Sequence, residues 1–126
     1  MSLTLEEALA RITAAEISDF AGKPVTLDST DSFGGGPLEV AAIWGDIPVA
    51  DALLRGGAAI DQRGEYGYTP LHQAVGQGHL AMVEFLLSRG ADPRLVNEFG
   101  STLDLATWNE QAEILAVLKK HLDAAG

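Results

Sequence analysis

The chain has 126 residues, a formal net charge of −10 at pH 7 and a hydrophobic fraction of 47%. This length suits one domain of ordinary size, and the hydrophobic fraction excludes a wholly disordered chain. The sequence has no cysteine, which excludes a disulfide framework and a thiolate metal site and fits a reducing compartment. The acidic balance argues against nucleic acids and anionic membranes, whose phosphates are neutralised by Lys and Arg. It favours a basic partner, and it also serves solubility.

The start of the chain has the pattern of neither an export signal nor a membrane anchor. Glu6 and Glu7 precede any long apolar run, which does not fit a signal peptide. No stretch approaches the roughly 20 apolar residues that a membrane span needs. We therefore expect a cytoplasmic protein that does not enter a membrane.

Residues 3–21 are predicted to be helical. The run from Thr4 to Glu7 has the form of a capping box, in which a hydroxyl and a carboxylate satisfy amides at the start of a helix. The run from Thr13 to Glu16 repeats this pattern and predicts a second short helix with Ile17 and Phe20. Two short helices in succession are therefore expected at this end of the chain.

The middle of the chain repeats itself at a spacing of 33 residues. The clearest copy is Gly-Tyr-Thr-Pro-Leu-His-Gln-Ala at residues 67–74. The matched positions are Gly34 and Gly67, Pro37 and Pro70, Leu38 and Leu71, Ala41 and Ala74, Gly45 and Gly78, Leu53-Leu54 and Leu86-Leu87, and Gly57-Ala58 and Gly90-Ala91. This period, together with the Thr-Pro-Leu-His core, is the ankyrin pattern, and the sequence therefore resembles the ankyrin-repeat family.

The resemblance implies an all-α fold, a solenoid of about four helix-pair units joined by β-turn fingers. The single domain, residues 1–126, divides into a degenerate N-terminal unit at 1–33, repeats at 34–66 and 67–99, and a C-terminal capping repeat at 100–126. In the first unit, Leu5 and Ala8 keep the same register with Leu38 and Ala41. The last unit lacks the proline and is one residue shorter, and it ends in the polar run Lys119-Lys120-His121. The resemblance also gives Thr69 and His72 structural roles, with hydrogen bonds made locally and to adjacent backbone.

No catalytic or metal-binding pattern emerges from the sequence. His72, His79 and His121 fall at non-equivalent positions in different units, whereas a metal site needs several ligands to converge. The run Gly34-Gly35-Gly36 is not followed by the Gly-Lys-Ser/Thr of a phosphate loop. The serines lack the context of a nucleophile elbow, and the carboxylates are scattered. We therefore expect no enzyme, no cofactor and no metal.

Six of the eight aromatic residues are predicted to lie on one side of the molecule. Phe33, Tyr66 and Phe99 recur just before the repeat glycine, at finger tips, and Tyr68 just follows it. Trp44 and Trp108 lie near the ends of the first helices of their units, whereas Phe20 and Phe85 are placed for the core. The resemblance implies that fingers and first helices line a concave contact surface. The predicted partner-binding residues are Phe33, Trp44, Glu65, Tyr66, Tyr68, Gln77, Glu98, Phe99 and Trp108.

Aromatic side chains anchor interfaces because they bury a large area with few torsions to freeze. We expect Trp44, Tyr68 and Trp108 to be exposed and to form a continuous line. The alternative is that the aromatic residues at the finger tips pack against the next finger, which would explain Phe33 and Phe99 without a partner.

The leading hypothesis is a non-enzymatic module that binds a protein with a basic or mixed apolar and basic surface. A more specific form is an immunity-type inhibitor of a basic toxin, because short, free-standing, acidic ankyrin proteins are similar to some bacterial immunity proteins. The second hypothesis is a structural or assembly subunit that self-associates through the same strip. The third, an enzyme with a site at the N-terminal unit, needs a pocket with convergent polar groups. We expect a monomer or weak dimer that binds neither nucleic acid nor membrane.

Overall fold

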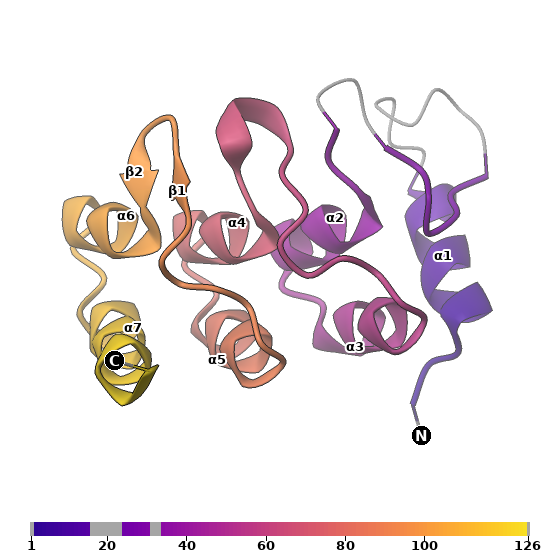
Figure 1. Ribbon diagram of the computed structural model, residues 1–126. Coiled ribbons are helices and arrows are strands. Elements are labelled where there is room, and N and C mark those ends of the chain that lie inside the picture. Colours follow the sequence, from indigo (N-terminus) through magenta and orange to yellow (C-terminus); the bar gives the residue numbers. More distant parts are fainter. Residues whose placement is uncertain (1, 16–23, 31–33, 126) are drawn as a thin grey trace.

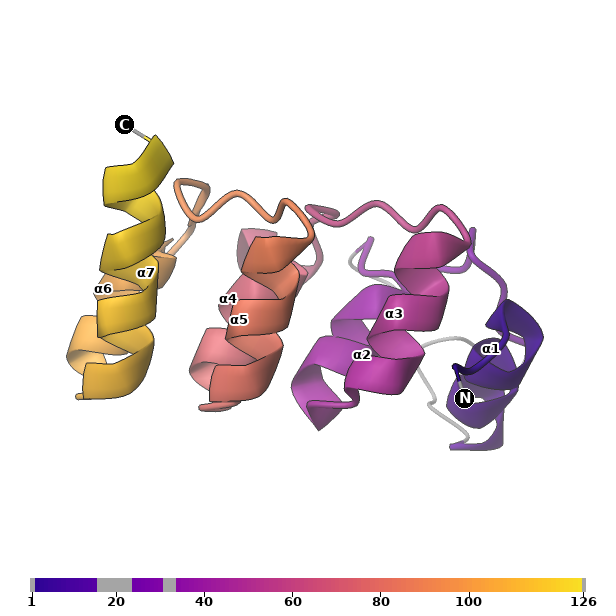
Figure 2. The same ribbon diagram turned by 90° about the horizontal axis from the view of Figure 1, so that it is seen from below.

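The computed structural model describes residues 2–15, 24–30 and 34–125 of the chain. Within these residues, antiparallel helix pairs stack side by side into a curved array, and loops project from one side of the stack (Figure 1). An inner row next to the loops consists of α2 (Pro37–Trp44), α4 (Pro70–Gly76) and α6 (Thr102–Trp108). An outer row consists of α3 (Ile47–Arg55), α5 (Leu80–Ser88) and α7 (Ala112–Ala125), as Figure 2 shows. The predicted all-α solenoid of helix pairs is confirmed.

Each inner helix begins at a residue that the repeat pattern places there. Thr69 is the N-cap of α4: its hydroxyl accepts a hydrogen bond from the amide of His72 at 3.2 Å and lies 2.8 Å from His72 Nδ1. The local hydrogen bonding expected of Thr69 and His72 is thus confirmed. The last unit keeps the cap with other residues, since the Ser101 hydroxyl accepts from the Asp104 amide at 3.1 Å. Its inner helix therefore forms without the proline.

The turn between paired helices also ties each unit to the one before it. Gly45 has a left-handed backbone (φ 71°), and a Cβ there would lie 2.9 Å from the ring of His79. The ring Nε2 of His79 lies 3.0 Å from the carbonyl oxygen of Ile43. In the next junction, Gln111 Nε2 donates to the carbonyl oxygen of Val75 at 2.7 Å. Side chains at equivalent turns therefore reach back to the end of the preceding inner helix.

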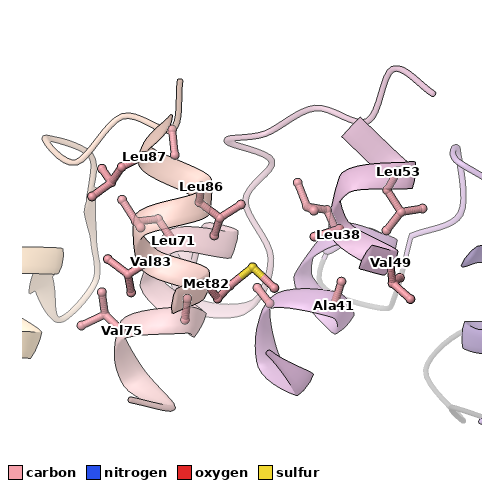
Figure 3. Packing of buried hydrophobic residues seen from close by; sticks show 14 of the residues in the cluster. Leu38, Ala41, Val49, Leu53, Leu71, Val75, Met82, Val83, Leu86 and Leu87 are labelled. Atoms are coloured by element: carbon pink, nitrogen blue, oxygen red, sulfur yellow. The ribbon is translucent and has the colours of Figure 1, made fainter. Parts of the chain in front are cut away.

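The hydrophobic core runs through the stack between the units rather than within any one of them. Figure 3 shows Met82 extending from its own unit toward the unit that contains Leu38 and Ala41. Leu86, on the outer helix of the same unit, is fully buried. Alanines recur at the inner-helix positions where units meet, and Ala41, Ala74 and Ala106 are all fully buried. Small side chains there allow neighbouring inner helices to approach closely, so each unit depends on its neighbours for burial.

The N-terminal helix α1 (Leu5–Ala14) begins with the predicted capping box at Thr4, but it lies in an unexpected place. The 33-residue register aligned Leu5 with Leu38 of the inner row, whereas α1 packs mainly against the outer helix α3. The Leu5 side chain lies over Gly56, 2.8 Å from where a Cβ would stand, and Arg55 Nη2 donates to the carbonyl oxygen of Leu3 at 2.5 Å. These contacts hold α1 on the outer row.

The predicted second cap at Thr13 is wrong. Thr13 lies in the last turn of α1, where its hydroxyl donates to the carbonyl oxygen of Leu9 and accepts from the amide of Val25, both at 2.9 Å. The hydroxyl therefore joins α1 to the segment at residues 24–30. The predicted second helix, with Ile17 and Phe20, lies outside the described residues.

The C-terminal unit ends the stack with polar side chains where the preceding unit is apolar. At the 32-residue offset, Val75 and Leu87 correspond to Thr107 and Lys119, and the first pair is buried whereas the second pair is exposed. This exchange is what a terminal unit requires, because one of its sides faces water. Within the described residues, no helix is long and apolar enough to cross a membrane.

Candidate protein-binding face

Two fingers with described tips lie side by side. The first contains the short 3₁₀ turn η2 (Glu65–Gly67), and the second is a hairpin of β1 (Val96–Asn97) and β2 (Gly100–Ser101). The Glu98 amide donates to the carbonyl oxygen of Tyr66 at 3.0 Å, and Arg63 Nη1 donates to that of Val96 at 2.7 Å. The tips are thus held by hydrogen bonds between neighbouring units.

The aromatic residues at these tips form a pair that is still half exposed. The rings of Tyr66 and Phe99 meet edge to face with centroids 5.3 Å apart, and each residue keeps 50% of its surface exposed. Packing of one finger tip against the next is therefore real, but it does not hide either ring. Phe33, the third predicted tip residue, lies outside the described residues, as does the neighbouring Asp31.

Tyr68 does not have the exposure that we expected. Its ring lies 5.8 Å from that of His72 and 6.3 Å from that of Phe99, and the residue is half-buried against the core. The side chain of Tyr68 therefore lies back over the start of α4. Tyr68 therefore braces the finger, and it is not a free anchor.

The two tryptophans lie at the C-terminal ends of inner helices. Trp44 ends α2 with 40% of its surface exposed, and Trp108 ends α6 with 61% exposed. The expected continuous line is interrupted between them, because the end of α4 carries Gly76 and Gln77, which are exposed but not aromatic. Gln77 lies at the C-cap of α4, so it belongs to the same row of helix ends.

Charge is distributed unevenly over the same elements. Residues 64–88 and 95–118, which contain the two fingers and the ends of α4 and α6, have no lysine or arginine. Glu98 is exposed at the second finger tip and Glu65 is partly exposed at the first. Glu110, two residues beyond Trp108, is also exposed. Acidic groups therefore accompany the exposed aromatic rings, and the nearby Arg63 is engaged with the carbonyl oxygens of Gly67 and Val96.

His72 is buried and serves the structure. Burial lowers the pKa of His72, the nearby backbone of Gly100 and Leu95 offsets part of this effect, and the Arg63 charge lowers the pKa further. Burial thus favours the neutral form of the imidazole. The described residues contain no group of three or more histidine, aspartate or glutamate side chains that could hold a metal ion.

Two surface hollows occur on the described part of the chain, one next to the end of α4 and one at the N-terminal helix. One, of about 310 Å³, lies between the turn at Gly78 and the start of α7. The other, of about 470 Å³, lies against α1 and is mostly apolar, with Glu6 and Thr13 as its polar members. The Thr13 hydroxyl is already engaged with Leu9 and Val25. The convergent polar groups that an N-terminal enzyme site would need are therefore not found among the residues that line this hollow.

Sequence reasoning missed two exposed residues next to these side chains. Val96, on β1, has 56% of its surface exposed beside the tip pair. A lone valine gives no signal, because single exposed apolar residues are common. Gly76 was also missed, although its smallness distinguishes it from Ile43 and Trp108 at the equivalent positions of the other units.

A stack of helix pairs with projecting hairpin fingers and an exposed aromatic face defines a class of binding module. A family model described as ankyrin repeats (many copies) matches residues 53–106. The chain belongs to the ankyrin-repeat family. Ankyrin repeats are protein–protein interaction modules, and the family is generally non-catalytic.

The chain is also similar to several larger proteins. Mouse (Mus musculus) protein phosphatase 1 regulatory subunit 27 is 36% identical over 78 residues, which cover 62% of this chain and 51% of the relative. Human (Homo sapiens) transient receptor potential cation channel subfamily A member 1 is 35% identical over 97 residues, covering 75% of this chain and 8% of the relative. Chicken (Gallus gallus) inversin is 31% identical over 103 residues, covering 81% of this chain and 9% of the relative. The chain spans about half the length of the first relative and less than a tenth of the other two.

Proposed function

We propose that this chain binds a partner protein through its finger–inner-helix face, defined here by Trp44, Tyr66, Gln77, Glu98, Phe99 and Trp108. The observation that carries this assignment is the exposure of four aromatic side chains on the described fingers and inner helices, whose one cation, Arg63, is engaged with the carbonyl oxygens of Gly67 and Val96. The outer row offers no comparable set among the described residues, since Phe85 is partly buried and stacked beneath the Arg89 guanidinium, 5.1 Å from its ring centroid.

The chemistry of the face indicates the chemistry of the partner. The rings supply apolar area, and Trp and Tyr are the residues that most often dominate binding energy. Glu98 and Glu110 lie around them, so the complementary surface combines apolar groups with lysine or arginine. A more specific version is that the partner is a basic toxin that the chain neutralises, and the genes beside this one would show whether a toxin accompanies it.

Self-association through this face is less favourable than binding of a basic partner. Two copies that met through this face would both bring the acidic groups Glu65 and Glu98 to the interface, and like charges across an interface are repulsive. We therefore propose a monomer that binds without catalysis, and a cytoplasmic location remains part of this proposal. Light scattering at micromolar concentration would reveal a dimer, and cell fractionation would test the location.

The test compares wild type with a Trp44→Ala, Trp108→Ala double variant as affinity baits, followed by calorimetry with each purified captured protein. We expect capture by wild type and loss in the double variant, with unchanged circular dichroism. Glu84→Gln, on the exposed side of α5, is the control and should retain the partner. If the wild type and the Trp44→Ala, Trp108→Ala variant bind a partner equally well, the binding surface lies instead on the outer helices or the N-terminal unit.

A further inference from the structure

The end of α4 has an open position where the flanking units carry large side chains. Gly76 is equivalent to Ile43 of α2 at the 33-residue offset and to Trp108 of α6 at the 32-residue offset. A Cβ added at Gly76 would meet no heavy atom within 4 Å, and the residue is exposed. Its φ is not in the left-handed region, so the backbone does not require glycine. Neither turn geometry nor close packing therefore explains the missing side chain.

Helices that end in tryptophan lie on both sides of α4. α4 packs between α2, which ends in Trp44, and α6, which ends in Trp108. Packed helices are about 8–10 Å apart, and a cation interacts with an aromatic ring within about 6 Å of its centroid. The distance from either neighbouring helix to a group above Gly76 is therefore within the reach of an indole side chain.

The electrostatics of the surroundings favour a cation over a neutral group. The segments that carry Gly76 and Trp108 contribute no lysine or arginine, and the exposed Glu110 follows Trp108 in the chain. Gln77, exposed beside Gly76, offers an amide oxygen that can accept from an ammonium or guanidinium group. Lysine and arginine also carry a long aliphatic stem that can cover apolar surface while the charged end keeps polar partners.

We propose that the open Gly76 position receives a lysine or arginine side chain of the partner, with Trp44 and Trp108 on either side. This inference rests on the proposed function, because it assigns one contact within the finger–inner-helix face. It makes Gly76 a specificity-determining residue: its absent side chain creates the space, and the flanking indoles select the charge.

The chain offers a direct probe, since it has two tryptophans and hence two indole N–H signals in a nuclear magnetic resonance spectrum. The ligand is a capped tetra-arginine peptide, and the neutral control is the same peptide with citrulline. We expect arginine to shift both indole signals and citrulline to leave them nearly unmoved. In Gly76→Leu the affinity measured at the indoles should fall about tenfold, since a filled position excludes the side chain.

Matched variants separate shape from charge and from folding. Ala81→Leu adds a similar side chain to the exposed surface of α5 and should bind as wild type. Trp108→Leu keeps apolar volume but removes the ring, and it should weaken arginine binding about threefold to tenfold. Circular dichroism confirms that each variant is folded, and Trp108→Leu keeps the test decisive if Gly76→Leu disturbs α4.

Equal indole shifts in wild type and Gly76→Leu would overturn the inference. Shifts of the Tyr66 and Phe99 ring signals without indole shifts would also overturn it, while leaving the finger–inner-helix face in place. If the captured partner of the preceding section binds the tryptophan double variant normally, the proposed function fails, whatever the peptide does. The two failures are thus distinguishable.

Discussion

The outer and inner rows of this solenoid use their side chains for different purposes. On the outer row, Asp51 accepts from Arg55 Nε at 2.9 Å and from Arg89 Nη1 at 2.7 Å, which links α3 to the end of α5. The inner row buries its alanines and leaves Trp44 and Trp108 in water. Under the proposed function, recognition belongs to the exposed ends of the inner row, and the outer row serves stability. Substitutions on one side should change one property and spare the other.

The largest expected effect is on stability, at Leu86. Leu86→Ala removes a fully buried side chain of the outer row and leaves a cavity between units, so unfolding should become easier by about 2–5 kcal/mol. Denaturant titration measures this change. Leu54→Ala, at a partly buried site on α3, should cost less. A Leu86→Ala protein as stable as wild type would show that the outer row does not hold the stack together.

The next effect is on binding, at the tryptophans. The Trp44→Ala, Trp108→Ala variant should lose about 2 kcal/mol or more of binding free energy, because exposed rings at an interface are frequent hot spots. Its free energy of unfolding should stay within about 0.5 kcal/mol of that of the wild type, as is usual for surface substitutions. Calorimetry and denaturation on one preparation give both numbers. A large loss of stability would mean that the inner row also supports the fold.

A smaller effect links pH to stability through His72. Its pKa is lower in the folded chain than the ordinary 6.5, so the unfolded chain takes up this proton first as the pH falls. The stabilisation is fully present above that value and is lost as the pH falls toward the folded-state pKa. Glu7, whose pKa hydrogen bonds from Thr4 lower from 4.5, titrates below this window.

Melting temperatures at pH 7.5 and 5.5 should therefore fall with pH in wild type. In His72→Gln, which starts from a lower stability, the fall should be shallower. Equal slopes in the two proteins would assign the pH dependence to other groups.

The smallest expected effect is on the rate of association with the partner. It is measured by changing one glutamate on each side of the molecule. Glu98→Lys and Glu84→Lys change the net charge identically, but Glu98 lies at a finger tip and Glu84 on α5. We expect Glu98→Lys to slow association with a basic partner a few-fold more at low salt, since charges at an interface rim steer the encounter. Stopped-flow measurements at two salt concentrations decide this. Equal rates for the two variants would mean that only the overall charge acts.

The parts of the fold that the sequence predicted are those that repeat. The spacing from Pro37 to Pro70 identifies equivalent inner helices, and neighbouring equivalents must pack together in a solenoid. The place of α1 was not predicted, because Leu5 packs over Gly56 through a contact outside the repeat pattern. The predicted exposure of Tyr68 was wrong for a similar reason. Its place in the repeat predicted that it lies on a finger, but its exposure depends on the neighbouring rings of His72 and Phe99.

The junction tie made by His79 has a consequence for how such a chain can grow. Gly78 has the same left-handed backbone as Gly45, and the ring of His79 lies against such a glycine and a carbonyl oxygen of the preceding inner helix. A duplicated copy of residues 67–99, inserted after residue 99, would present its own histidine to Gly78 as His79 is presented to Gly45. A longer target could then be matched by gene duplication of one module.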